Sequence, residues 1–491
     1  MPGAGTQCKE VHDPDDKWIV DIETVLGCVE DDKVKTGSIC RVPEKIRPAE
    51  DQGYSYRPQL VAMGPFHRGT SNDLQIHELT KWQFMRSLLA VRTQNNSLSV
   101  ERCSKAVKGR GSIIRASYGE KIEMGEEEFA RMMLLDGCFL LELLLRLTEP
   151  KEPVEQKYVL QFLTDLTLLE NQIPFIVLST LSSTLLKLPD AAQRPGLPDP
   201  QHALSHHLFN EFKLSPENIA KSLLECNDAR ADFSKGVYHF LHLIHLCSPD
   251  PYPEEERRKH PRKLQRCARK LQALGITIKA KAKQTTDAQG DDESEENAAS
   301  VLRKFMDKFE FKIEFNERKR ELIIPTLHIK EATEVKWRNL IAWEQIGLTE
   351  IGYKFTSYAY FFKGLVCSVH DLKLLEHKGV IKVQNEVIKD KDLVKMFRSI
   401  TTGEEKMDGR YRKVCKRLNK AKVNGCCVIF KMPGHYLWRF LEWLRHRLST
   451  TYLGALQRTY LKAPWKIVGV VYGTILLILT VMQVVYAARG Q

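Results

Sequence analysis

The feature that most constrains this chain is an apolar run near its C-terminus. Residues Ile467 to Ala488 (IVGVVYGTILLILTVMQVVYAA) contain no ionisable side chain apart from two tyrosines. A run of this length is sufficient to cross a hydrocarbon layer of about 30 Å as an α-helix. We therefore expect one transmembrane helix over 467–488, with 489–491 as a short tail. A buried core helix is the alternative interpretation of the same run.

The charges around this run predict an orientation. Lys and Arg are retained on the cytoplasmic side of a membrane, and here only Arg489 follows the run. The N-terminus also lacks the apolar core of a signal peptide. We expect a single-pass protein of the plasma membrane with its body in the cytosol, and an extracellular body is the alternative. The basic residues before the run are Arg439, Arg445, Arg447, Arg458, Lys462 and Lys466.

The predicted span suggests two partners. The first is the lipid bilayer itself. The second is another copy of the chain, because Gly469 and Gly473 form a GxxxG pair, which allows two helices to approach closely in lipid. An unidentified protein partner is expected for the body.

The overall charge narrows the classes of partner. The 491 residues carry a formal net charge of +12, which favours a negatively charged neighbour such as nucleic acid or an anionic leaflet. The basic cluster from Arg257 to Lys270 contains no aromatic residues of the kind that stack on bases. Nucleic acid is therefore not expected as a partner, and the cluster is interpreted as a solvated face.

Composition changes along the chain predict its organisation. Residues 285–300 are acidic and free of large apolar side chains, a composition typical of disorder. We expect a polar N-terminal segment over 1–38, a helical first part over 39–270, a disordered acidic loop over 271–300 and a second part over 301–434. A basic aromatic helix over 435–466 then leads to the predicted span.

Apolar periodicity predicts a mainly α fold. From Asp73 the apolar positions Leu74, Leu79 and Trp82 continue at helical spacing. Residues 129–147 are apolar nearly all round, which predicts a buried central helix, and 158–188 predict a helix broken at Pro174. Alternation over 309–315 followed by a polar turn and an apolar run to residue 329 predicts a small β-hairpin. The expected fold class is a large helical body with this hairpin and one C-terminal transmembrane helix.

Three histidines were considered as metal ligands. His239, His242 and His245 are spaced three apart in a helix predicted over 233–247. No carboxylate or cysteine stands at ligand spacing beside them, and the twelve cysteines contain no CxxC pair. The pattern favours a structural role, and neither a metal nor a cofactor is expected.

The motif LLENQIPF combines polar residues with a helix break. We expect Asn171 and Gln172 to satisfy backbone groups exposed at Pro174, and Glu170 to pair with an arginine across the core. This structural role is favoured over a ligand site. The motif comprises Leu168, Leu169, Glu170, Asn171, Gln172, Ile173, Pro174 and Phe175.

No familiar catalytic motif is present. The sequence lacks a phosphate-binding GxxxxGK[ST], a dinucleotide-binding GxGxxG, a nucleophile elbow GxSxG and a zinc-binding HExxH. No catalytic residues are therefore expected, and the chain is predicted not to be an enzyme.

These motifs, taken in order, resemble the plant membrane proteins that contain the "domain of unknown function 247". The resemblance covers most of the chain, and it implies a largely helical plant membrane protein with no established catalytic site. It suggests a role in protein recognition or signalling, and some grass members are similar to proposed pollen-side determinants of self-incompatibility. The alternatives are a membrane-tethered enzyme and a structural tether. The motifs are ICRVPEKIR (39–47), YRPQLVAMGPFHRG (56–69), HELTKWQFMRSLL (77–89), MMLLDGCFLLELL (132–144), LLENQIPFIVL (168–178), IIPTLHIKEATEVKWRNLIAWEQ (323–345) and HDLKLLEHKGVI (370–381).

Overall fold

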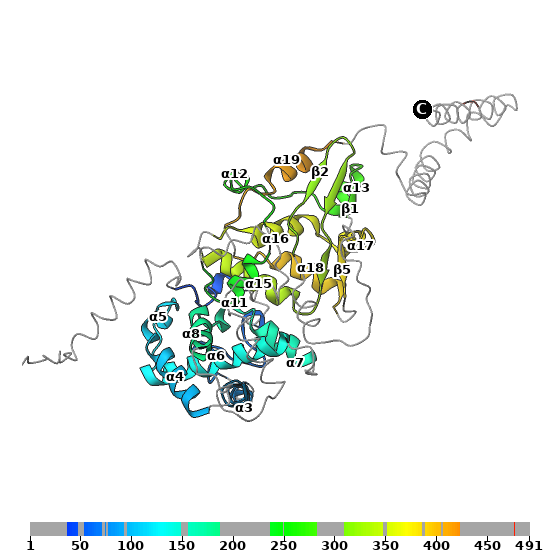
Figure 1. The fold of residues 1–491 in the computed structure, drawn as a ribbon. Helices are drawn as coiled ribbons and strands as arrows, with labels where there is room; N and C mark the ends of the chain where they lie inside the picture. Colours follow the sequence, from blue (N-terminus) through cyan, green and yellow to red (C-terminus); the bar gives the residue numbers. More distant parts are fainter. Residues whose placement is uncertain are drawn as a thin grey trace, which may run out of the picture. The chain divides into compact units, whose positions relative to one another are not determined.

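Helices and a few short strands make up the part of the chain that the computed structural model describes (Figure 1). The described residues are 37–47, 54–70, 74, 77–92, 96–148, 156–186, 236–248, 250–281, 309–346, 351–384, 388–403, 406–422 and 476. The chain divides into two units, residues 1–272 with 276–421, and residues 273–275 with 422–491. Within the second unit, Gly275 adopts a left-handed backbone with φ 77°. The elements below belong to the first unit, except that the last residue of α13 is in the second.

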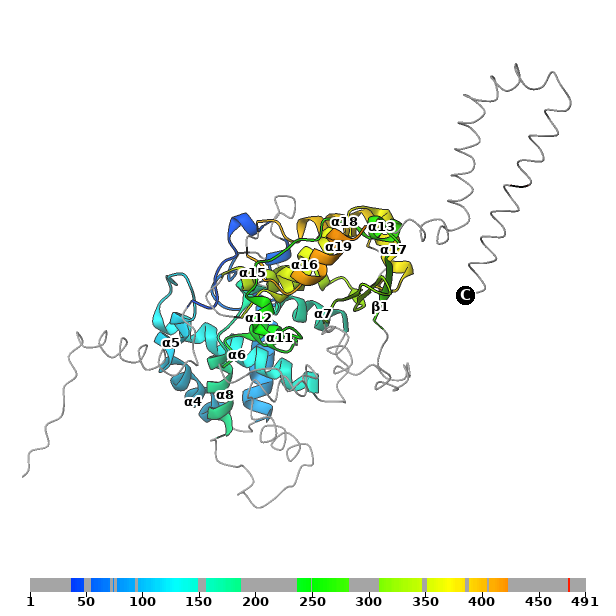
Figure 2. The ribbon, with the colours of Figure 1, turned by 90° about the horizontal axis from the view of Figure 1, so that it is seen from above.

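The first half of the described chain is helical. The helix α6 is its centre, because α3, α4, α5 and α8 all contact it, as Figures 1 and 2 show from two directions. The elements are η2 (Glu44–Ile46), η3 (Tyr54–Tyr56), α3 (Glu78–Arg86), the π-helical turn η4 (Ser87–Arg92), α4 (Asn96–Lys108), α5 (Gly111–Ala116), α6 (Glu126–Thr148), α7 (Gln156–Asp165), η5 (Leu169–Asn171), α8 (Phe175–Leu186) and α11 (Phe240–Leu246).

The buried central helix predicted from 129–147 is confirmed as α6. Its first turn carries three glutamates, which complement the positive end of the helix dipole. Phe129, Met133 and Phe139 are buried, and each such side chain contributes roughly 1.5–3 kcal/mol by leaving water. A Cβ at Gly137 would lie 2.6 Å from Leu181 Cδ1, so this glycine allows α8 to pack closely against α6.

Two helix boundaries differ from the prediction. The break predicted at Pro174 is wider, because α7 ends at Asp165 and α8 begins at Phe175, with η5 between them. The helix predicted over 233–247 begins later, at Phe240, since Gly236 has a left-handed backbone and His239 caps the first turn. Residues 233–235 lie outside the description.

The second half combines short helices with two small sheets. The sheet of three strands has the order β1-β3-β2, with β1 parallel and β2 antiparallel to β3. The other sheet pairs β4 with β5 in parallel. The elements are α12 (Glu254–Arg257), α13 (Ala268–Ala273), β1 (Thr277–Ala280), β2 (Glu314–Asn316), β3 (Glu321–Ile324), β4 (Leu327–Ile329), α15 (Thr333–Ile346), α16 (Lys354–Leu365), α17 (Val369–His377), β5 (Ile381–Val383), α18 (Asp390–Ser399) and α19 (Arg412–Lys420).

The predicted β-hairpin is present as β2 and β3, and its turn places Arg320 in the left-handed region with φ 52°. It is shorter than predicted, because residues 309–313 are not in a strand and the apolar run to residue 329 is divided between β3 and β4. The predicted disordered loop over 271–300 begins too early. Its residues Thr277 to Ala280 form strand β1, because the buried Ile278 pairs opposite Leu322 in the sheet. Residues 282–300 lie outside the description.

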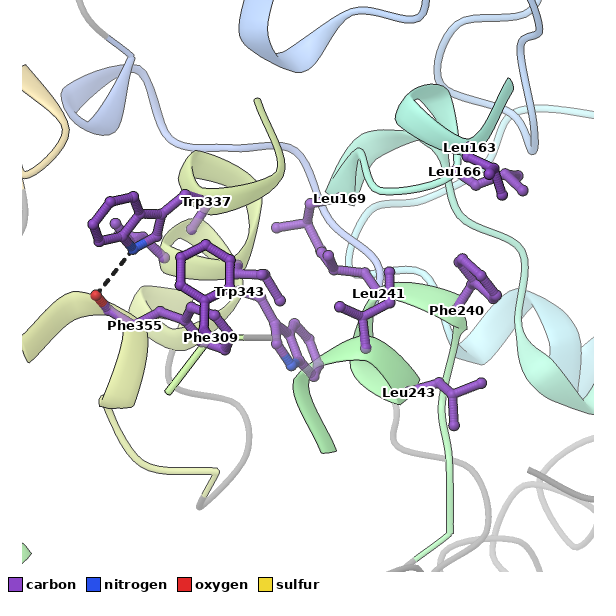
Figure 3. Close-up of a cluster of buried hydrophobic side chains, with 14 of the residues drawn as sticks. Leu163, Leu166, Leu169, Phe240, Leu241, Leu243, Phe309, Trp337, Trp343 and Phe355 are labelled. Atoms are coloured by element: carbon purple, nitrogen blue, oxygen red, sulfur yellow. Dashed lines mark hydrogen bonds between the residues drawn. The ribbon is translucent and has the colours of Figure 1, made fainter. Parts of the chain in front are cut away.

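One hydrophobic core joins the two halves. In Figure 3, Leu169 of η5 and Leu241 of α11 lie between the tryptophans of α15 and two leucines at the end of α7, Leu163 in the helix and Leu166 just after it. The Trp337 indole N–H donates to the Phe355 carbonyl at 3.2 Å, so this large ring is both packed and hydrogen-bonded.

The fold-class prediction needs one correction. Within the described residues, no helix has both the length and the apolar content needed to cross a membrane. Helix α6 has 23 residues, but Asp136, Glu142 and Arg146 interrupt its apolar surface. The fold class of the described residues is therefore mainly helical with two small sheets, and the predicted C-terminal transmembrane helix is not found among these residues. The segment from Ile467 to Ala488 lies outside the description apart from Leu476, as do Gly469, Gly473 and residues 435–466.

Candidate functional site

The motif from Leu168 to Phe175 occupies the irregular stretch between α7 and α8, and all eight of its residues are buried. The Asn171 amide oxygen accepts a hydrogen bond from the Met63 N–H at 2.6 Å. Its NH₂ group donates to the carbonyls of Val61 and Asp165 at 2.9 and 3.0 Å. Asn171 thus satisfies backbone groups of two chain segments at once.

Gln172 does the same at the ends of two helices. Its NH₂ group donates to the carbonyls of Leu166 and Leu168, both at 2.7 Å, and its amide oxygen accepts from the Leu241 N–H at 3.0 Å. The chain passes so close here that a Cβ at Gly64, which has φ +68°, would lie 2.8 Å from the Gln172 carbonyl oxygen. The predicted structural role of Asn171 and Gln172 is confirmed.

Asp165 fixes the neighbouring extended segment. Its carboxylate accepts hydrogen bonds from three successive backbone N–H groups, those of Gln59 at 3.0 Å, Leu60 at 2.7 Å and Val61 at 2.9 Å. Burial raises the pKa of Asp165 to about 6, and the three N–H hydrogen bonds act against that rise. The Asp165 carboxylate therefore accepts backbone hydrogen bonds that a neighbouring strand would accept in a sheet.

A fully buried ion pair completes this arrangement. Lys81 Nζ lies 2.7 Å from Asp136 Oδ1 and 2.7 Å from Glu78 Oε1, and it also donates to the Ala62 carbonyl. The other Asp136 oxygen accepts from the Gly64 N–H at 2.8 Å. Neither charged side chain of the Lys81–Asp136 pair has any exposed surface, so both charges need compensation inside the protein, to which Glu78 and Arg68 also contribute.

Glu170 holds the segment that precedes this region. Its carboxylate accepts from the Val42 N–H at 2.7 Å, pairs with Arg47 and lies 3.3 Å from His67 Nε2. Burial acts to raise the pKa of Glu170, but the hydrogen bonds from His67 and Val42 and the Arg47 charge hold it below its usual value. The predicted pairing of Glu170 with an arginine is confirmed. We call Lys81, Asp136, Asp165, Glu170 and Asn171 the polar clamp.

The three histidines belong to α11 and its N-cap, and all are buried. His239 Nδ1 accepts from the His242 N–H, and His242 Nδ1 accepts from the Tyr238 N–H, both at 3.2 Å. The His239 ring also packs edge-on against Trp343 with 4.6 Å between the ring centres. Burial lowers the pKa of all three histidines, that of His242 to about 3, so the rings are neutral at pH 7. Within the described residues, no group of His, Cys, Asp and Glu is placed to hold a metal ion.

Glu344 organises the start of α16. It accepts from the N–H groups of Phe355 at 2.9 Å and Thr356 at 2.8 Å, from the Thr356 hydroxyl at 2.7 Å, and it lies 3.0 Å from His245 Nε2. These backbone groups belong to the first turn of α16, where N–H groups have no partner within the helix. Burial raises the pKa of Glu344, although the hydrogen bonds to its carboxylate oppose this.

Lys354 has the complementary role at the end of α11. Its Nζ donates to the carbonyls of His245 and Ser248, both at 2.6 Å. A cation is thus placed at the negative end of a helix, while burial lowers its pKa. We call His245, Glu344 and Lys354 the buried centre. Beside it, the buried Arg410 guanidinium donates to Asp408 at 2.8 Å and to Asp250 at 3.2 Å.

Both clusters bind backbone groups of the fold. Their carboxylates are buried, and most of their hydrogen bonds come from backbone N–H groups. A catalytic acid or base must instead reach a substrate. The clamp and the centre therefore fix irregular segments and helix ends within one core.

A different kind of surface lies on α3. Leu79 and Trp82 are 70% and 48% exposed, whereas the buried face of the same helix carries Lys81 and Met85. Gln83 and Arg86 continue the exposed side at helical spacing. We call Leu79, Trp82, Gln83 and Arg86 the outer stripe of α3. Large apolar side chains that stay exposed on a helix are typical of interaction surfaces.

The sequence prediction missed several of these residues. The signal for Asp136 and Glu344 was present, because a carboxylate inside an apolar helix needs a buried partner. Nothing local indicated that Asp165 would bind residues 59–61, since that contact depends on the tertiary fold. The exposure of Leu79 and Trp82 also contradicts the simplest interpretation of an apolar periodic pattern, in which such positions face the core.

The chain is similar in sequence to two proteins of Arabidopsis thaliana. The 469 aligned residues of the UPF0481 protein At3g47200 from Arabidopsis thaliana are 22% identical, and the alignment covers 91% of this chain and 85% of that protein. The putative UPF0481 protein At3g02645 from the same plant is 26% identical over 167 residues, covering 33% of this chain and 30% of that protein. No solved structure matches the chain.

The family is shown by a match that covers most of the chain. The model of the DUF247 family, described as plant protein of unknown function, matches residues 39–479. This range contains the polar clamp, the buried centre and the outer stripe of α3. The chain therefore belongs to the DUF247 family of plant proteins.

Proposed function

We propose that this plant protein is a non-catalytic recognition protein that binds another protein through the outer stripe of α3. The observation that carries the proposal is the pair of exposed apolar side chains, Leu79 and Trp82, one turn apart on a single helix. Tryptophan and arginine are enriched among the residues that dominate binding energy at protein interfaces. The stripe offers both, with Trp82 one turn before Arg86.

The helix that carries the stripe is firmly held. On its inner side Lys81 pairs with Asp136 of α6, and Arg68 pairs with Glu78 at 3.0 Å at its first turn. A helix fixed in this way presents its outer side chains without a large loss of entropy when a partner binds. This supports a surface adapted to recognition.

The test compares capture of plant proteins by three versions of the full chain. One is unchanged, one carries Leu79→Ser with Trp82→Ala, and a matched control carries Tyr54→Ser with Leu160→Ser. Tyr54 and Leu160 are also exposed, at 65% and 40%, but lie on other elements. We expect a protein that the unchanged chain and the control capture and the stripe variant does not.

The captured protein is then purified and its Kd is measured by calorimetry. Trp82→Ala should weaken binding by roughly 2 kcal/mol or more, which is about a 30-fold rise in Kd. Equal capture by all three versions would contradict the proposal. Within this function, a part in pollen-side self-incompatibility has family resemblance as its only support, and uniform sequences across a grass population would exclude it.

An enzyme is the second candidate, and one observation favours it. Perturbed pKa values gather at functional sites, and burial shifts those of Glu344 and Lys354 in opposite directions. An enzyme that used this pair would turn over a small molecule, and Glu344→Gln would abolish the turnover while the chain stayed folded. If Glu344→Gln changes stability and leaves partner capture intact, the recognition function is favoured.

A further inference from the structure

Two cysteines that are far apart in the sequence meet beside one carboxylate. Cys267 precedes α13, and Cys367 lies between α16 and α17; both are free thiols. Asp371 accepts hydrogen bonds from the Arg269 N–H at 2.9 Å and the Cys367 N–H at 3.3 Å. One side chain thus binds both cysteine-containing segments.

The two segments also touch through their backbones. A Cβ at Gly364 would lie 2.5 Å from the Leu264 carbonyl oxygen and 2.8 Å from the Leu264 Cβ. Cys367 Sγ is 3.7 Å from the Gly364 carbonyl oxygen. The cysteines therefore sit on two chain segments that are in direct contact three residues before each thiol.

The thiols differ in access. Cys367 is exposed and Cys267 is partly buried. Burial, Cys267 and Asp371 raise the pKa of Cys367, while the charge of Arg398 opposes the rise. A thiol of raised pKa reacts slowly, but it is also a poor leaving group, so a disulfide made from it resists reduction.

We propose that Cys267 and Cys367 form a dithiol site that a low-molecular-weight disulfide, such as oxidised glutathione, converts into an intramolecular disulfide. The Cys367 thiolate attacks one sulfur of the reagent, and one glutathione thiol leaves. Cys267 then gives its proton to solvent and attacks Cys367 Sγ, and the second glutathione thiol leaves. Two protein thiols are oxidised and one reagent disulfide is reduced to two thiols.

The disulfide would connect the start of α13 to the turn between α16 and α17. A cross-link between residues so distant in sequence restricts the unfolded chain strongly, which favours the folded state. The full chain should therefore melt at a higher temperature after oxidation, by at least about 3 °C. This effect is independent of the outer stripe and of the proposed recognition function.

The test incubates the reduced full chain with oxidised glutathione and digests it with trypsin without reducing it. Cleavage at the flanking basic residues releases a peptide of residues 267–269 joined to one of residues 364–373, which mass spectrometry detects. Cys267→Ser should stop at a stable glutathione adduct on Cys367. The control Cys415→Ser alters a buried thiol in α19 and should leave the linked peptide unchanged.

The wild-type digest decides the proposal without any variant. A linked pair of these two peptides supports it. A stable glutathione adduct on Cys367 of the unchanged chain, a link from Cys367 to another cysteine, or no reaction at Cys367 would each overturn it.

Discussion

The polar clamp and the buried centre solve the same problem in two different ways. The clamp uses carboxylates and an amide to satisfy an extended segment, residues 59–64, whose N–H groups Asp165, Asn171 and Asp136 receive. The centre places an anion at the start of α16 and a cation at the end of α11. In the clamp, buried polar groups thus replace a missing strand, and in the centre buried charges satisfy the ends of α11 and α16.

The difference predicts unequal dependence on each charge. In the clamp, Lys81 is the cation closest to the fully buried Asp136 carboxylate. In the centre, Glu344 has four donors, and its hydrogen bonds come from three residues. Replacing Lys81 leaves the buried Asp136 charge without its nearest cation. Replacing Glu344 leaves N–H groups at the start of α16 without an acceptor.

The largest effect is expected from Lys81→Met. It should lower the free energy of unfolding of the full chain by about 3–5 kcal/mol in urea denaturation, because the buried Asp136 carboxylate loses its nearest cation and keeps only Arg68 at 3.9 Å. The matched control is Lys105→Met, which breaks an exposed pair with Glu101 at 2.7 Å and should cost less than about 1 kcal/mol. Equal losses for the two variants would mean that the clamp pair is not the compensated unit described above.

Glu344→Gln should have the next largest effect. The amide offers one accepting oxygen instead of two, so one or more donors at the start of α16 lose their partner. The expected loss is about 1–3 kcal/mol in the same denaturation. Glu310→Gln, which alters an exposed pair with Lys281, serves as the control and should change little. A loss above that of Lys81→Met would reverse the order of the two regions.

The smallest effect is a difference in pH dependence, and it has opposite signs for Glu170 of the clamp and Glu344 of the centre. The folded-state pKa of Glu170 is lowered, so its contribution is present above about pH 4.5 and is lost as the pH falls. The folded-state pKa of Glu344 is raised, so the folded state binds more protons above pH 4.5, and stability is lost as the pH rises towards 7.

This can be measured as unfolding free energy between pH 4 and pH 7. Glu170→Gln should reduce the loss of stability on acidification, and Glu344→Gln should reduce the loss as the pH rises. If the two substitutions changed the pH dependence of stability in the same direction, the predicted electrostatic difference between Glu170 and Glu344 would be wrong. This holds even if both substitutions were destabilising.

Two residues of the clamp, Glu170 and Asn171, could be predicted from the sequence because their signals are local. Asn171 and Gln172 stand in an apolar run beside a proline, and polar amides in that position need backbone partners. Glu170 needed a cation for the same reason. The identity of that cation, Arg47, could not be predicted, since it comes from a segment more than a hundred residues earlier.

The small sheets show where sequence signals are weakest. The hairpin of β2 and β3 was predictable because a polar turn separates two apolar stretches. Strand β1 was missed because it has four residues and pairs in parallel with a strand some forty positions later. The pairing of β4 with β5 is also distant, and three residues carry no distinct periodicity.

The outer stripe of α3 could not be distinguished from a core face by its spacing. Leu79 and Trp82 fit a helical apolar period as well as Met85 and Leu88 do, yet only the latter pair is buried. The deciding residue is Lys81, which turns inward to meet Asp136 and so turns the neighbouring apolar side chains towards solvent.

The strand order of the three-stranded sheet affects how well this chain tolerates added residues between β1 and β2. Ala280 ends β1 opposite Ile324, and Glu314 begins β2 opposite Ile323, so the connection leaves and re-enters the sheet at the same end of β3. The two points are separated by about 10 Å, two strand spacings. Lengthening this connection with flexible residues would cost only about 0.6 kcal/mol per doubling, because its ends stay fixed by the sheet. We therefore expect this chain to accept added residues between these strands while the strands keep their register.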